Sequence, residues 1–209
     1  MHGPTTSVAV VSDLDSVNLA LLVLRCGIGA VMLAHGLNHI YGGGKIAGTA
    51  GWFQSLGMRP GKVHAWLASL TEVAGGIALV LGLLTPLGGA AVVGVMVVAW
   101  ITNHRGNGFF IFRPGEGWEY VMTLTLVGFA IAVVGPGEWS LDEAFDIRTD
   151  LVGTTGLLIA LVAGAGGAAL LLATCWRPER PAVEPDVAAG PETEPAVQSE
   201  PAVQSDAEG

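Results

Sequence analysis

The chain has 209 residues, of which 51% are hydrophobic and 13% are charged. A soluble domain carries roughly 25% charged residues, so this composition excludes an ordinary soluble globular domain and favours a protein that resides in membrane lipid. The net charge is −9 and there is no basic stripe, which excludes nucleic acid as an expected partner.

Five apolar stretches follow one another along the chain, each close to the ~20 residues that a helix needs to cross hydrocarbon. They cover residues 17–41, 63–84, 86–103, 117–135 and 151–174. We therefore expect an all-α integral membrane protein with a four-helix transmembrane bundle, a fifth transmembrane helix and a disordered C-terminal tail. The expected units are an outer N-terminal segment (1–16), the bundle (17–142), a linker with the extra helix (143–176) and an acidic tail (177–209).

The first stretch holds ionisable side chains at membrane depth, which are costly without a partner or water. Arg25 lies inside the stretch, and His35 and His39 lie near its end. We therefore expect a polar interior. Arg25 either pairs with Glu72 of the second stretch or extends toward the outer headgroups.

The connections between the stretches also carry signals. Trp52-Phe53 in the loop over 42–62 indicates either a short interfacial helix or a packed loop. Thr85-Pro86 predicts a tight turn, which makes the second and third spans antiparallel neighbours.

The basic residues indicate an orientation, because cytoplasmic loops are enriched in Lys and Arg. With five spans, Arg148 alone lies in a loop on one side. The other side holds Lys45, Arg59, Lys62, Arg105, Arg113, Arg177 and Arg180. We expect the N-terminus outside and the C-terminus in the cytoplasm.

Polar residues near the cytoplasmic span ends are the candidate site. The expected proton-handling groups are His35, Glu72 and His104, and the expected ligand-binding residues are Arg25, Asn38, His39, Trp118 and Glu119. Three interpretations compete: a metal site, a pocket for a quinone or similar lipophile, and side chains that merely tie helices together. No tight motif beyond His35 and His39 supports a metal, so we expect none.

The fifth stretch carries small residues at four-residue spacing: Gly156, Ala160, Gly164 and Ala168. Such a seam lets membrane helices approach closely. It packs either on the chain's own bundle or against another subunit. Beyond Trp176 the chain is rich in Pro, Glu and Ala and is expected to be disordered.

An ordered set of short motifs carries a family resemblance. These are Arg25…His35-Gly36, Trp52-Phe53…Leu56-Gly57, Glu72-Val-Ala-Gly75-Gly76, Leu81-Gly82-Leu83-Leu84-Thr85, Asn103-His104…Gly108-Phe109-Phe110, Gly117-Trp118-Glu119-Tyr120 and Gly135-Pro136-Gly137-Glu138-Trp139-Ser140-Leu141-Asp142. Over about residues 17–142 the chain resembles the DoxX family of small bacterial membrane proteins. The resemblance implies a four-helix membrane bundle. It singles out Arg25, His35, Glu72, His104 and Glu119.

The family name comes from a subunit of a thiosulfate:quinone oxidoreductase, and relatives are described as membrane partners of redox proteins. The resemblance therefore implies a bacterial inner-membrane subunit of a quinone-linked oxidoreductase complex that holds a quinone or similar lipophile. No covalently bound cofactor is expected, so the chain is at most an accessory subunit. The alternative is a non-catalytic scaffold subunit, or a homo-oligomer, assembled through the seam between Gly156 and Ala168.

Overall fold

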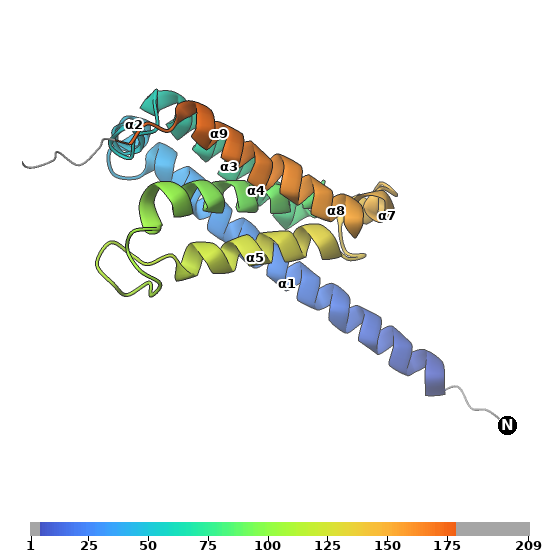
Figure 1. Ribbon diagram of the computed structural model, residues 1–209. Coiled ribbons are helices and arrows are strands. Elements are labelled where there is room, and N and C mark those ends of the chain that lie inside the picture. Colours follow the sequence, from blue (N-terminus) through green and yellow to red (C-terminus); the bar gives the residue numbers. More distant parts are fainter. Residues whose placement is uncertain (1–4, 179–209) are drawn as a thin grey trace, which may run out of the picture. The chain divides into compact units, whose positions relative to one another are not determined.

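The computed structural model describes residues 5–178, with side chains from residue 13 onward, and these residues form helices joined by short connections (Figure 1). The elements are α1 (Thr5–Tyr41), α2 (Lys45–Ser55), α3 (Gly61–Leu81), α4 (Thr85–Ala99), η1 (Trp100–His104), α5 (Glu119–Val134), α6 (Leu141–Ala144), α7 (Arg148–Leu151), α8 (Thr154–Ile159), η2 (Ala160–Gly166) and α9 (Gly167–Cys175). The π-helical segment η1 extends α4, and η2 joins α8 to α9 in what we call the last helix, Thr154–Cys175. The predicted disordered tail lies, from residue 179 on, outside the described residues.

Within residues 5–178, four helices are long and apolar enough to cross a membrane, which confirms a multi-pass membrane protein. They are Asp13–Tyr41, Gly61–Leu81, Thr85–His104 and Thr154–Cys175. The fourth predicted span corresponds to α5, which has only 16 residues and measures about 24 Å at 1.5 Å per residue. At the other extreme, α1 begins at Thr5, so most of the expected N-terminal segment is helical and projects beyond the other helices in Figure 1.

The helix α4 lies at the centre of the packing. It contacts α3, α5 and the last helix, while α1 packs against α3. Glycines make these approaches possible: a Cβ on Gly29 of α1 would lie 2.8 Å from the carbonyl oxygen of Gly76, and one on Gly89 would lie 2.7 Å from that of Gly128. Backbones this close permit van der Waals packing, which drives helix association in lipid. The core side chains are Met32, Leu79, Val92, Leu124 and Ile131.

The turn between α3 and α4 is as tight as predicted. Gly82 ends α3 in the left-handed conformation at φ +62°, which glycine adopts without a Cβ penalty. The buried carboxylate of Asp142 then accepts hydrogen bonds from the backbone N–H groups of Leu84 (2.6 Å) and Thr85 (2.9 Å). A residue of the short helix α6 therefore caps the start of α4.

The small-residue seam of the last helix packs on the chain's own α4 and α5. A Cβ on Gly156 would collide with the carbonyl oxygen of Ala132, and one on Gly164 would lie 2.8 Å from that of Ala90. Ala160 and Ala168 are also buried. Of the two predicted alternatives the structure has the intramolecular one, and the seam is not free to bind another subunit.

The loop over 42–62 contains the helix α2, which confirms the predicted short helix. Its place at a membrane interface stays a prediction. Phe53 packs inward and Trp52 is exposed. The linker after α2 is hydrogen-bonded to the residues that follow the last helix. The indole N–H of Trp176 donates to Leu56 O at 2.9 Å, and Arg177 N donates to Gly57 O at 2.7 Å.

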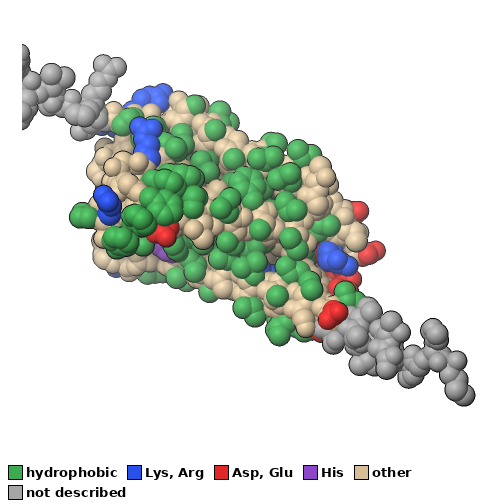
Figure 2. Space-filling model, turned by 60° about the horizontal axis from the view of Figure 1, so that its bottom comes forward, with side chains coloured by type: hydrophobic (Ala, Val, Ile, Leu, Met, Phe, Trp, Pro, Cys, Tyr) green, Lys and Arg blue, Asp and Glu red, His purple; other side chains and the backbone are tan. Residues whose placement is uncertain are grey.

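The two ends of the bundle differ in charge. In Figure 2 most Lys and Arg side chains gather at one end and most Asp and Glu side chains at the other. The basic end contains the start of α2 at Lys45. The acidic end contains α6 and α7, where Arg148 pairs with Glu143. This distribution matches the sorting of charges predicted from five crossings.

Candidate functional site

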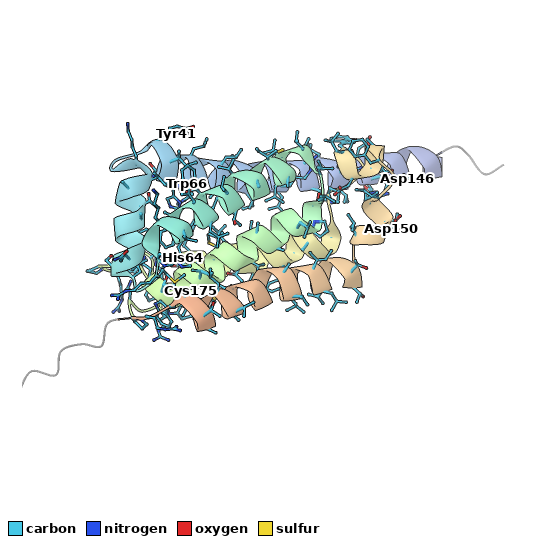
Figure 3. The ribbon with its side chains drawn as sticks, turned by 90° about the horizontal axis from the view of Figure 1, so that it is seen from above. Tyr41, His64, Trp66, Asp146, Asp150 and Cys175 are labelled. Carbon is cyan, nitrogen blue, oxygen red and sulfur yellow. The ribbon has the colours of Figure 1, made fainter. Side chains whose placement is uncertain are left out.

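A cavity of about 570 Å³ lies within the bundle, between α3 and α4 and bounded by α1, α2, α5 and the last helix. Its volume is within the roughly 300–1,000 Å³ typical of small-molecule sites. The cavity lies toward the end of the bundle that holds α2, and Figure 3 shows His64 at that end. The acidic end, with Asp146 and Asp150, lies opposite.

A buried acid–base pair faces this cavity. His39 Nδ1 of α1 and Glu72 Oε2 of α3 are 3.1 Å apart, and the Glu72 side chain is only 4% exposed. The two atoms are within ion-pair range but are not aligned for a hydrogen bond, and each lacks another hydrogen-bond partner. The His39 ring lies 6.5 Å from the ring of Trp52 and 6.3 Å from that of Phe53, centroid to centroid. An unsatisfied buried polar pair against aromatic walls can bind a ligand with polar atoms.

Two more histidines of α1 and α3 line the cavity. His64 is 3% exposed; its Nε2 lies 3.3 Å from Arg59 O, whereas its Nδ1 is buried without a partner. His35 lines the cavity one helical turn before His39 and is exposed. The cavity wall therefore presents imidazoles from two helices.

The π-helical end of α4 supplies the fourth histidine. His104 Nδ1 lies 2.8 Å from Glu116 O, and its Nε2 lies 3.3 Å from Asn103 Nδ2. His104 and Asn103 line the cavity, as do Glu116 and Tyr120. Single-turn π segments occur frequently at functional sites because they re-aim side chains.

Besides Arg25, three predicted ligand-binding residues are absent from the cavity lining. The Trp118 ring stacks on that of Trp100 with centroids 5.3 Å apart. Glu119 accepts a hydrogen bond from Ile111 N at 3.3 Å, at the surface. Asn38 is exposed, with its side chain beside Gly42. These positions support the loop and the helix ends around the site.

Arg25 lies at the opposite end of the bundle, and the predicted pairing with Glu72 is wrong. Its guanidinium donates to Leu79 O at 3.0 Å, to Val80 O at 2.5 Å and to Trp139 O. The first two carbonyls belong to the last turn of α3, where helix carbonyls have no helical partner. Glu72 faces His39 instead. At 3% exposure Arg25 is enclosed by the protein and acts as a structural cap.

Among the described residues, no three His, Cys, Asp or Glu side chains are grouped as ligands for a metal ion. The histidines and Glu72 are spread around one cavity, an arrangement suited to hydrogen bonding with an organic ligand.

Residues 20–105 match the DoxX family model. Over this range the chain is similar to the DoxX family. No curated protein and no solved structure matches the chain. The predicted resemblance is thus confirmed from α1 to the end of η1, and the motifs after Arg105 fall outside the match.

The DoxX region contains most of the polar cavity wall. It includes His35, His39, His64, Glu72 and His104. The remaining polar wall (Glu116 and Tyr120) and the last helix lie beyond it. Sequence reasoning did not select His64, Trp52 or Tyr120 for the site. The signal that could have found His64 is its position at the end of α3 nearest α2. His35, His39 and His104 also lie near the ends of their spans at that end of the bundle.

Proposed function

We propose that this DoxX-like membrane protein binds a quinone, or a lipophile of the same kind, in the cavity between α3 and α4. The observation that carries the proposal is the pair of facing atoms His39 Nδ1 and Glu72 Oε2, both buried and without another hydrogen-bond partner at the wall of an apolar cavity. A quinone has a flat apolar ring that suits aromatic and aliphatic walls. Its ring oxygens accept hydrogen bonds when oxidised and donate them when reduced.

The pair supplies both kinds of contact. An imidazole N–H donates to a ring oxygen, and a carboxylate accepts from a quinol O–H. Histidine can also carry a proton near neutral pH. His39 is therefore the group for proton exchange with the ring, and Glu72 orients the imidazole and relays the proton. His35, His64 and His104 offer further contacts along the same wall.

The two electrons of quinone reduction must come from elsewhere, so we place the protein beside a partner oxidoreductase, as an accessory subunit. Purification from the native membrane in mild detergent checks this placement. We expect a redox enzyme to accompany the chain in constant ratio. A chain that purifies alone or only with copies of itself contradicts it.

Direct ligand binding tests the proposal. Ubiquinone-1 and menadione are titrated into the purified protein in nanodiscs while tryptophan fluorescence is followed, because Trp52 stands beside His39. We expect saturable quenching by at least one of the two rings. Naphthalene, which has the same flat shape as menadione but no ring oxygens, is the control and should bind more weakly. Equal binding of naphthalene and menadione contradicts recognition by the polar pair.

We also propose that the protein lies in a bacterial inner membrane with its basic end in the cytoplasm. In a variant lacking Cys26 and Cys175, single cysteines at Lys45 and Asp146 are treated with a membrane-impermeant maleimide on intact spheroplasts. The cysteine at position 146 should be labelled at once, and that at position 45 only after lysis. The reverse pattern refutes this orientation.

A further inference from the structure

The cavity continues from its polar wall to the outer, lipid-facing surface of the bundle. Small residues of α4 and the last helix also line the cavity, namely Ala90, Gly94, Ala163, Gly164 and Gly167. Ala163 and Gly167 are exposed, in a helix apolar enough to cross the membrane. Hydrocarbon therefore surrounds this opening.

The opening is a groove between α3 and the last helix, with α4 as its floor. Figure 3 shows α4 between these two helices. Leu67 of α3, 45% exposed, lines one side of the cavity, and Gly167 lines the other. A Cβ added to Gly167 would meet no atom within 4 Å. The groove is therefore open at Gly167, in contrast to the seam glycines such as Gly164, which are tightly packed.

Two buried polar atoms at the inner end of the cavity are available to the polar head of a ligand. His64 Nδ1 and Glu72 Oε2 both lack hydrogen-bond partners, and both residues are 3% exposed. Leaving such atoms unsatisfied costs free energy. A ligand whose polar head meets these atoms must extend its remaining part along the apolar groove toward the lipid.

We propose that the groove between Leu67 and Gly167 holds the single hydrocarbon tail of the ligand. The substrate class is then a long-tailed membrane quinone that enters sideways from the bilayer, rather than a short quinone that enters from water. This inference rests on the proposed function. The small side chains of the floor leave room for one chain beside the last helix.

Photo-crosslinking tests the tail position. The probe is the ring that binds in the titration above, bearing an alkyl tail with a diazirine, and the protein is the full chain in nanodiscs. Mass spectrometry should place the crosslinks on α3 near Leu67 and on the last helix near Gly167. Excess ubiquinone-1 or menadione should abolish them, because the ring directs the tail.

Two matched glycine variants make the test specific. G167L fills the groove and should lose the crosslinks, with an unfolding temperature no lower than that of the wild type. G27L on α1 is the control: Gly27 is exposed, lies outside the cavity, and a Cβ there also meets nothing within 4 Å. It should keep the crosslinks.

The remaining outcomes separate the two proposals. Crosslinks that are spread over all lipid-facing helices, that resist competition by the short ring or that survive in G167L overturn the tail groove while the ring site stands. Failure of both short rings to bind the wild-type protein overturns the proposed function and the groove with it.

Discussion

Replacing Glu72 with glutamine should weaken quinone binding about 10- to 100-fold. The variant keeps the shape of the side chain but removes the carboxylate that faces His39 Nδ1 at 3.1 Å. Hydrogen bonds that involve a charged group contribute about 1.5–3 kcal/mol, and every 1.4 kcal/mol corresponds to a tenfold change in affinity. The neutral glutamine amide can neither form an ion pair with protonated His39 nor take up a proton from it.

The matched control for E72Q is E119Q. Glu119 lies outside the cavity and accepts from Ile111 N at the surface, so its replacement should leave the dissociation constant unchanged. Both variants are measured by the fluorescence titration with the ring that binds the wild type. An E72Q protein that binds as tightly as wild type shows that the polar end of the ligand lies elsewhere. Unchanged binding together with normal turnover of the partner complex would favour a scaffold subunit.

Replacing Arg25 with methionine should be the most destabilising change in the DoxX region, by about 3 kcal/mol or more, because it leaves buried carbonyls without their charged donor. The guanidinium connects the last turn of α3, at Leu79 and Val80, to Trp139 in the loop after α5. Lysine keeps the charge but not the forked donors, so R25K should fall between wild type and R25M. Thermal unfolding in detergent, followed by circular dichroism, measures the series.

R148M is the control for R25M. Arg148 pairs with Glu143 at the surface of the same end of the bundle, where both side chains are about one-third or more exposed. Exposed pairs contribute about 0–1 kcal/mol, so R148M should unfold close to the wild-type temperature. If R25M were as stable as R148M, Arg25 would not be a structural cap, and the alternative of a functional arginine would return.

The helices and their ends follow from local sequence. Apolar runs of membrane length predict the spans, Thr85-Pro86 predicts the tight turn, and the spacing of Gly156 to Ala168 predicts a close helix contact. These features hold because a helix in lipid must satisfy its own backbone hydrogen bonds and expose apolar side chains, whatever its neighbours are. The shortness of α5 and the helical start at Thr5 are differences at the ends, where local signals are weakest.

The site could be predicted only in part. Histidines at the ends of adjacent spans indicated that His35, His39 and His104 gather at one end, because alternate crossing directions bring those ends together. Which of these histidines faces Glu72 depends on how each helix is rotated about its own axis. No single residue determines that rotation. The close approach at Gly29 and Gly76 sets the rotation of α1 against α3 and so selects His39.

The sequence by itself determined that this is a multi-pass helical membrane protein with ionisable groups inside, since length, hydropathy and charge act locally along the chain. Only the tertiary structure decided that Arg25 caps α3, that Asp142 caps α4 and that the last helix packs its seam on α4 and α5. It also decided that residues of α3 and α4 line a common cavity. These outcomes depend on contacts between residues far apart in the chain, such as Arg25 and Trp139, which are 114 positions apart. Contacts of that range depend on how all the helices pack together, because each helix can present several faces to its neighbours.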